Sequence, residues 1–227
     1  MKKTFNQWNK GELQREFGLK RHEECEALNA WLLMPDEVPI TLNDFEQNML
    51  DLSRDEARIY IEEWNEWELR DQFIGPIIKL ARFNDPERLI STFSERNLEA
   101  KVKGIRSNDD IELSGKIDWM IASGMGRPEK PFFFIHEYKQ EGGSTRSNSG
   151  QLLATMLAAQ ELNDDGKPIY GAYVVGHNWF FVVLQGKLYC MTDAYVSTKE
   201  SDLKEIVRLL KAQKLMINER ISEAGAD

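Results

Sequence analysis

The chain has 227 residues, of which 41% are hydrophobic and 30% charged, a composition typical of a folded globular protein rather than a disordered one. No apolar run approaches the ~20 residues of a membrane-spanning helix, and the start, MKKTFNQWNKGELQREF, lacks the apolar segment of a secretory signal. We therefore expect a cytoplasmic protein with no membrane partner.

The net charge of −9, from 29 Lys and Arg against 38 Asp and Glu, argues against non-specific coating of nucleic acid. It does not exclude phosphodiester chemistry, because binding depends on local patches and a centre that gathers metal ions must be acidic. Cys25 and Cys190 form no CxxC pair. We expect reduced thiols and no zinc site.

Residues 1–60 are predicted to form helices and short turns. The stretch 13–33 is helix-forming in composition, and Met34-Pro35-Asp36 then interrupts it. We interpret 1–60 as an N-terminal helical extension of a domain that covers 61–227. One hypothesis is that this extension mediates homodimerisation, because most oligomers of identical chains are symmetric pairs.

A long helix is predicted from about Asp44 towards Phe83, with Thr41-Leu42-Asn43-Asp44 as its cap. The stretch Ser53-Arg54-Asp55-Glu56 could interrupt it as a second cap. Gly75-Pro76 should kink this helix or start a new one, because proline has no amide hydrogen to donate. Its apolar stripe follows helical spacing and comprises Trp64, Trp67, Phe73, Ile74, Ile77 and Ile78.

Strand-like patterns follow, over 90–104 and 111–122. In the second strand, alternation predicts one face with Leu113, Gly115, Ile117, Trp119 and Ile121, and the other with Ser114, Lys116, Asp118 and Met120. The apolar run 132–135 then predicts a central strand that is buried on both faces.

The remaining elements are a loop over 142–150, a helix from Gln151 to Leu162, and a hairpin of strands 170–175 and 180–184. A short strand over 188–191 and an amphipathic helix over 199–221 complete the chain. The order is helix, three strands, helix, then strands. It predicts an α/β sheet with helices on both sides.

The end of the third core strand carries the first candidate site. Its two-residue period predicts Glu137, Lys139 and Glu141 on one face. Because unpaired buried charge is costly, a divalent cation would explain them. We expect Glu137 to bind Mg²⁺ through oxygen, and Lys139 to hold or deprotonate an attacking water or to stabilise the transition state.

Asp118 on the preceding strand is the second candidate ligand. If the two strands pair as a hairpin, Asp118 and Glu137 converge on one cation, with the backbone carbonyl of Tyr138 as a further ligand. The cation would act as a Lewis acid and lower the pKa of a bound water.

The succession of GKIDWMI, 18 residues between Asp118 and Glu137, EYK, and Gln151 resembles the PD-(D/E)XK nuclease superfamily. The resemblance covers roughly residues 60–195 and implies a restriction-endonuclease-like core. It matches Asp118, Glu137 and Lys139 to the D…ExK signature, and Gln151 to the glutamine of the following helix. The resemblance implies Mg²⁺ as the metal, with Mn²⁺ as its substitute. The family's proline before the aspartate is replaced here by Ile117.

Residues 65–70, NEWELR, resemble the helix that precedes the sheet in nuclease domains of type I restriction enzymes. This resemblance implies that Glu66 reaches the metal through water, with Glu68 as the alternative. More loosely, the whole chain resembles restriction-endonuclease-like proteins of Bacteroidetes bacteria.

Simpler interpretations stay open beside these. Asp118 could pair with Lys116 or Lys139, Glu137 with Lys139 as an ordinary ion pair, and Gln151 could only cap a helix. Glu66 could be one of many solvated acids. We interpret His22, His136 and His177 as structural or surface residues, with His136 on the face opposite Glu137.

The leading hypothesis is a Mg²⁺-dependent (endo)deoxyribonuclease, a hydrolase that cuts phosphodiester bonds. DNA is favoured over RNA as the substrate, and the sequence leaves endo- versus exonuclease action open. The alternative is a catalytically inactive nuclease-fold protein that acts as a binding or regulatory module.

Overall fold

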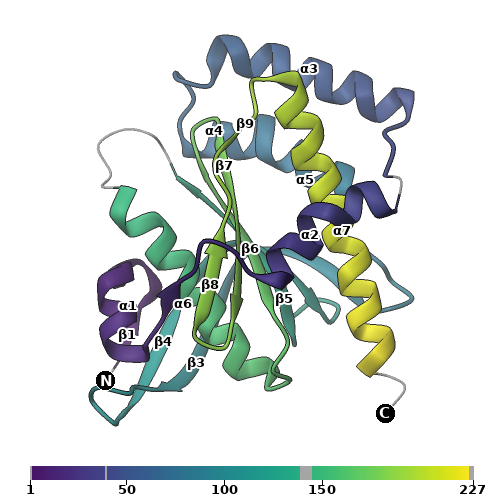
Figure 1. Ribbon diagram of the computed structural model, residues 1–227. Helices are drawn as coiled ribbons and strands as arrows, with labels where there is room; N and C mark the ends of the chain where they lie inside the picture. Colours follow the sequence, from purple (N-terminus) through teal and green to yellow (C-terminus); the bar gives the residue numbers. More distant parts are fainter. Residues whose placement is uncertain (1, 39, 139–144, 225–227) are drawn as a thin grey trace.

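The computed structural model describes residues 2–38, 40–138 and 145–224 as an α/β fold, which confirms the predicted class. Figure 1 shows a central sheet with helices on both sides. The helices are η1 (Phe5–Gln7), α1 (Lys10–Phe17), α2 (Glu26–Glu37), α3 (Asp44–Tyr60), α4 (Glu66–Leu69), the π-helix η2 (Arg70–Ile74), α5 (Gly75–Ala81), α6 (Thr145–Asn163) and α7 (Glu200–Ala224).

The strands are β1 (Lys2–Thr4), β2 (Lys20–Arg21), β3 (Ile90–Lys103), β4 (Asp110–Ser123), β5 (Pro131–Tyr138), β6 (Ile169–Val175), β7 (Asn178–Gln185), β8 (Leu188–Met191) and β9 (Tyr195–Val196). The sheet runs in the order β1-β4-β5-β6-β7-β8-β2, with β3 paired to β4 and β9 to β7. Strands β3, β4 and β5 are antiparallel neighbours, whereas β5 and β6 are parallel and are joined through α6. The predicted core strands and the hairpin 170–184 are confirmed.

Two apolar clusters cover the two faces of the sheet. One joins the sheet to α2, α3, α5 and α7, and the other joins it to η1, α1 and α6 (Figure 1). Among the described residues, none of the helices combines the length and the apolar composition that crossing a membrane requires.

The predicted long helix is in fact interrupted. It starts at Asp44 as expected, with the Asn43 side chain accepting a hydrogen bond from the Glu46 amide, but it passes through Ser53 without a break and ends at Tyr60. A new helix begins at Glu66, and Asn65 and Glu68 form a second reciprocal cap. The prediction at Gly75 is confirmed, because α5 begins there.

The first 60 residues are not purely helical as predicted. Strand β1 pairs with β4, and strand β2 pairs with β8. Two short segments of this N-terminal stretch are therefore part of the sheet. Pro35 was predicted to interrupt the helix, but it lies inside the last turn of α2. Trp31 of α2 is fully buried, and its ring meets the edge or face of Phe133, Tyr170 and Phe181 on the sheet.

The predicted faces of β4 are wrong beyond Ile117. Leu113 and Ile117 pack in the cluster beneath α6, but Trp119 packs in the opposite cluster and Met120 returns to the first. The alternation therefore slips by one residue. The physical reason lies in the neighbouring strand, where Glu95 adopts a left-handed backbone with φ of 55° opposite this point.

Candidate functional site

Strand β5 lies between β4 and β6, and its register with β4 brings the Asp118 carboxylate to a histidine. Trp119 pairs with Ile135, and one residue further on Asp118 Oδ2 lies 3.1 Å from His136 Nδ1. His136 is fully buried, and the Asp118 side chain is 21% exposed. The carboxylate thus reaches the surface while one of its oxygens is held from inside.

The far side of the imidazole is anchored to α6. His136 Nε2 lies 3.3 Å from Thr155 Oγ1, and that hydroxyl also lies 3.1 Å from the Gln151 carbonyl, to which it donates. A hydroxyl has one proton. When it donates to Gln151, the contact with His136 is a hydrogen bond only if Nε2 carries a proton and donates. The chain Asp118–His136–Thr155 therefore links β4, β5 and α6.

On the other side of β4, Arg70 of η2 fixes the backbone at the same position. Its Nη2 donates to the Asp118 carbonyl oxygen at 3.2 Å, and its guanidinium pairs with Glu95, which also pairs with Lys116. Burial acts to raise the pKa of Glu95, but the hydrogen bonds from Lys116 and Arg70 together lower that pKa below its ordinary value. Glu95 is thus held as a carboxylate.

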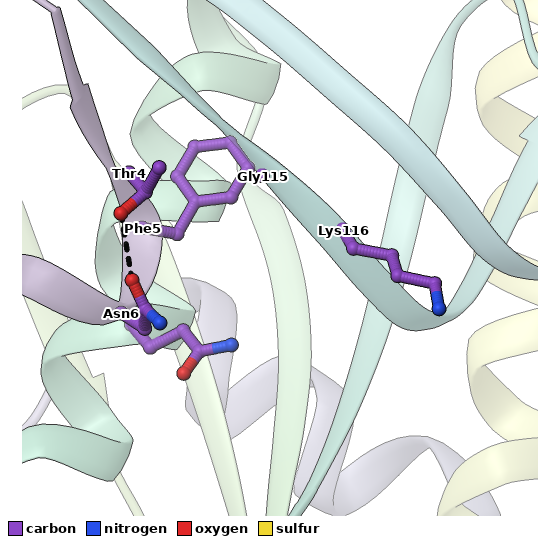
Figure 2. Close-up of a pocket in the computed structure, with 6 residues that line it drawn as sticks. Thr4, Phe5, Asn6, Gly115 and Lys116 are labelled. Atoms are coloured by element: carbon purple, nitrogen blue, oxygen red, sulfur yellow. Dashed lines mark hydrogen bonds between the residues drawn. The ribbon is translucent and has the colours of Figure 1, made fainter.

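Gln151 lines a small cavity of about 300 Å³ together with Thr4, Phe5, Asn6, Gly115 and Lys116. Figure 2 shows the Phe5 ring turned towards Gly115 and the Lys116 side chain extending away from Thr4 and Asn6. A Cβ at Gly115 would lie 2.7 Å from Phe5 Cδ2, so glycine permits this packing. The prediction that Gln151 opens the helix is wrong, because α6 begins at Thr145.

The other predicted site residues are only partly described. Glu137 and Tyr138 continue β5, with their backbones paired to Val174 and Val175 of β6, but their side chains, together with Lys139 and Glu141, lie outside the described residues. Glu66 begins α4, and its side chain is likewise outside.

Glu68, the alternative to Glu66, is engaged elsewhere. Its Oε2 accepts a hydrogen bond of 2.7 Å from the Asn65 amide as part of the helix cap. Within the described part of the chain, no group of three or more His, Cys, Asp or Glu side chains is arranged to hold a metal ion.

Two residues at this site were not identified from the sequence, His136 and Arg70. His136 is buried, in agreement with its interpretation as a structural residue, but its contact with Asp118 was not predicted. The signal was present in the hairpin, since cross-strand neighbours share a face once the register is known. Arg70 gave no such signal, because its contact is with a backbone oxygen.

A comparison with protein-family models finds none that matches the chain, and a comparison with curated proteins finds no match.

Proposed function

We propose that the chain is a metal-dependent nuclease with a restriction-endonuclease-like core, acting on phosphodiester bonds in DNA rather than RNA. In this proposal Asp118 and Glu137 bind Mg²⁺ or Mn²⁺, with the Tyr138 carbonyl as a further ligand. Lys139 assists the attacking water, Gln151 orients it, and Glu66 makes an outer contact through water.

The observation that carries the proposal is the antiparallel pairing of β4 with β5, which places Asp118 on the strand next to the one that carries Glu137. Two acids on such neighbouring strands are what the D…ExK arrangement requires. The antiparallel β3-β4-β5 group, followed by α6 and a parallel β6, is compatible with the same core.

The donor chemistry at Asp118 suits a hard divalent cation. A carboxylate supplies the oxygen ligand that Mg²⁺ prefers, and this one is partly exposed. His136 holds Oδ2 and thereby orients the group, as partners of metal-binding carboxylates commonly do. The bound cation would supply Lewis acidity and a water of lowered pKa.

The test is cleavage of supercoiled, linear and single-stranded DNA, and of RNA, with Mg²⁺ or Mn²⁺. We expect cleavage by the wild-type protein and its loss in Asp118→Asn and Lys139→Ala. Asp109→Asn and Lys101→Ala are matched controls, because both residues are exposed and neither belongs to the proposed site. Equal cleavage by Asp118→Asn and wild type would exclude the assignment.

A second candidate is a nuclease fold that binds or regulates without turnover. The specific observation for it is that a buried histidine already occupies one oxygen of the Asp118 carboxylate. Calorimetric titration with Mg²⁺ and Mn²⁺ separates the two functions. Heat of binding that disappears in Asp118→Asn favours the nuclease, and its absence in the wild-type protein favours the second candidate.

A further inference from the structure

A second cavity, about 700 Å³ in volume, lies on the opposite side of β4 from α6, and we call it the tryptophan cavity. It is lined by α4, η2, α5, β3 and β4, and its volume falls within the ~300–1,000 Å³ of small-molecule sites. The lining combines aromatic rings with cations: Trp67, Phe83, Trp119, Arg70, Lys79 and Arg82.

Trp67 is the most unusual member of this lining, because its side chain is large, apolar and 69% exposed. Arg70 holds it in place from one side: the guanidinium carbon lies 5.3 Å from the centre of the Trp67 ring and 5.2 Å from that of Trp119. A ring with a fixed position and an accessible surface is suited to stacking against a flat ligand.

The charges around the cavity favour an anionic ligand. Lys79 is exposed and has no ion pair within the described part of the chain, and Arg82 is 64% exposed with its partner Glu46 3.5 Å away. Of the two acids on the lining, Glu95 is paired with Arg70 and Lys116, and Asp71 is the other. A cationic ligand would meet at least two exposed positive groups.

We propose that the tryptophan cavity binds a nucleotide, whose base stacks on Trp67 and whose phosphate lies near Lys79 and Arg82. A nucleotide combines the flat face that Trp67 accepts with the negative charge that the two cations favour. The Trp119 ring also lines the cavity, and its buried indole nitrogen has no hydrogen-bond partner among the described residues.

This inference goes beyond the proposed nuclease activity and does not depend on it. The cavity uses neither the Asp118 carboxylate nor the residues around Glu137, and stacking needs no metal. Binding is therefore measured in a chelator, where failure of the nuclease proposal has no influence on the result.

The experiment is fluorescence anisotropy with a labelled single-stranded DNA of about ten nucleotides, within the ~4–16 that such sites cover. We expect Trp67→Ala to weaken binding roughly 5- to 150-fold, the value of one base stack, and Trp67→Phe to restore most of it. Lys79→Glu should weaken binding and reduce its salt dependence. Phe45→Ala is the matched control, because Phe45 is 65% exposed and lies outside the cavity.

Competition with adenosine monophosphate distinguishes the two sources of a nucleotide. Displacement of the DNA by the mononucleotide, lost in Trp67→Ala, supports a free nucleotide as ligand. DNA binding that depends on Trp67 and resists the mononucleotide supports a single strand. Wild-type affinity in Trp67→Ala, or no binding of either probe by the wild-type protein, overturns the proposal.

Discussion

The contact between Asp118 and His136 is expected to contribute measurably to the free energy of unfolding. Hydrogen bonds to charged groups contribute about 1.5–3 kcal/mol. The separation of 3.1 Å is longer than the ~2.7–2.9 Å of the strongest charge-assisted bonds, and the carboxylate is partly exposed. Both facts place this pair in the lower half of the range, at about 1.5–2 kcal/mol.

A double-mutant cycle measures this value directly. Asp118→Ala, His136→Leu and the double variant are unfolded in urea without metal, followed by tryptophan fluorescence and circular dichroism. Interactions that either side chain makes elsewhere cancel when the changes are independent. His136→Asn is a further variant, because its amide nitrogen takes nearly the position of Nδ1 and should retain part of the coupling.

The refuting result is a coupling energy below about 0.5 kcal/mol, the scatter expected of independent sites. Glu99→Ala combined with His136→Leu is the control, because Glu99 is exposed on β3 and has no contact with His136. Coupling as large in this control as in the pair would also refute the reasoning, since the effect would then be a general response of the sheet.

The variant His136→Leu also separates the two proposed functions, because each function predicts an opposite change in the affinity for Mg²⁺. If His136 orients a metal-binding carboxylate, His136→Leu should weaken Mg²⁺ binding by about 10- to 100-fold, as loss of such partners commonly does. If His136 instead blocks the carboxylate, the variant should bind Mg²⁺ more tightly than the wild-type protein. Calorimetry measures both outcomes.

Three further predictions concern stability. Gly150→Ala should destabilise the fold by about 1–3 kcal/mol, measured by urea unfolding, because the added Cβ would overlap the Trp8 carbonyl oxygen. Trp31→Phe should cost about 1–3 kcal/mol in a single transition, because the buried indole donates to the Leu209 carbonyl at 2.9 Å and fills the core. Glu95→Gln should make the protein lose less stability in acid than the wild-type protein loses. The folded pKa of Glu95 is lowered, so its carboxylate stabilises the fold above the ordinary pKa of 4.5. This stabilisation disappears as the pH falls through the folded value.

Each of these has a control and a contrary outcome. Gly11→Ala adds a methyl group whose nearest neighbour is the Asn9 side chain at 3.3 Å, so it should be far better tolerated than Gly150→Ala. Two separate unfolding transitions in Trp31→Phe would indicate that the N-terminal helices unfold apart from the sheet. If Glu95→Gln loses stability in acid as the wild-type protein does, the ion-pair argument is contradicted.

Long periodic segments were predictable from the sequence, and short or irregular ones were not. Strands β3 and β4 have fourteen residues each, enough for alternation to appear, whereas β1 and β2 have three and two. The break after Tyr60 was missed because the surrounding residues favour a helix. Its signal was nevertheless present, since Asn65 and Glu68 have the spacing of a capping box.

The candidate site divides in the same way. The sequence identified Asp118 as an acid on the strand next to β5, and the antiparallel pairing of those strands is now observed. The sequence could not show that the alternation of β4 side chains shifts by one residue at Asp118. This shift depends on the left-handed backbone of Glu95, a conformation that is rare for a non-glycine residue. An unbroken alternation along β4 predicted Trp119 and Leu113 on one face of the sheet, although they lie on opposite faces.

This irregularity leaves Asp118 with contacts on both sides of β4. The Asp118 side chain turns towards His136 and α6, while its carbonyl oxygen accepts a hydrogen bond from Arg70, which also contacts both tryptophans of the tryptophan cavity. A ligand that moves Trp67 would therefore act on Arg70, and Arg70 is bonded to the backbone of the proposed metal ligand. If both proposals hold, Trp67→Ala should alter cleavage through substrate binding, raising KM more than it lowers kcat, whereas Arg70→Lys should lower kcat as well, because the shorter reach of a single ammonium group cannot keep the bonds to Glu95 and to the Asp118 carbonyl together.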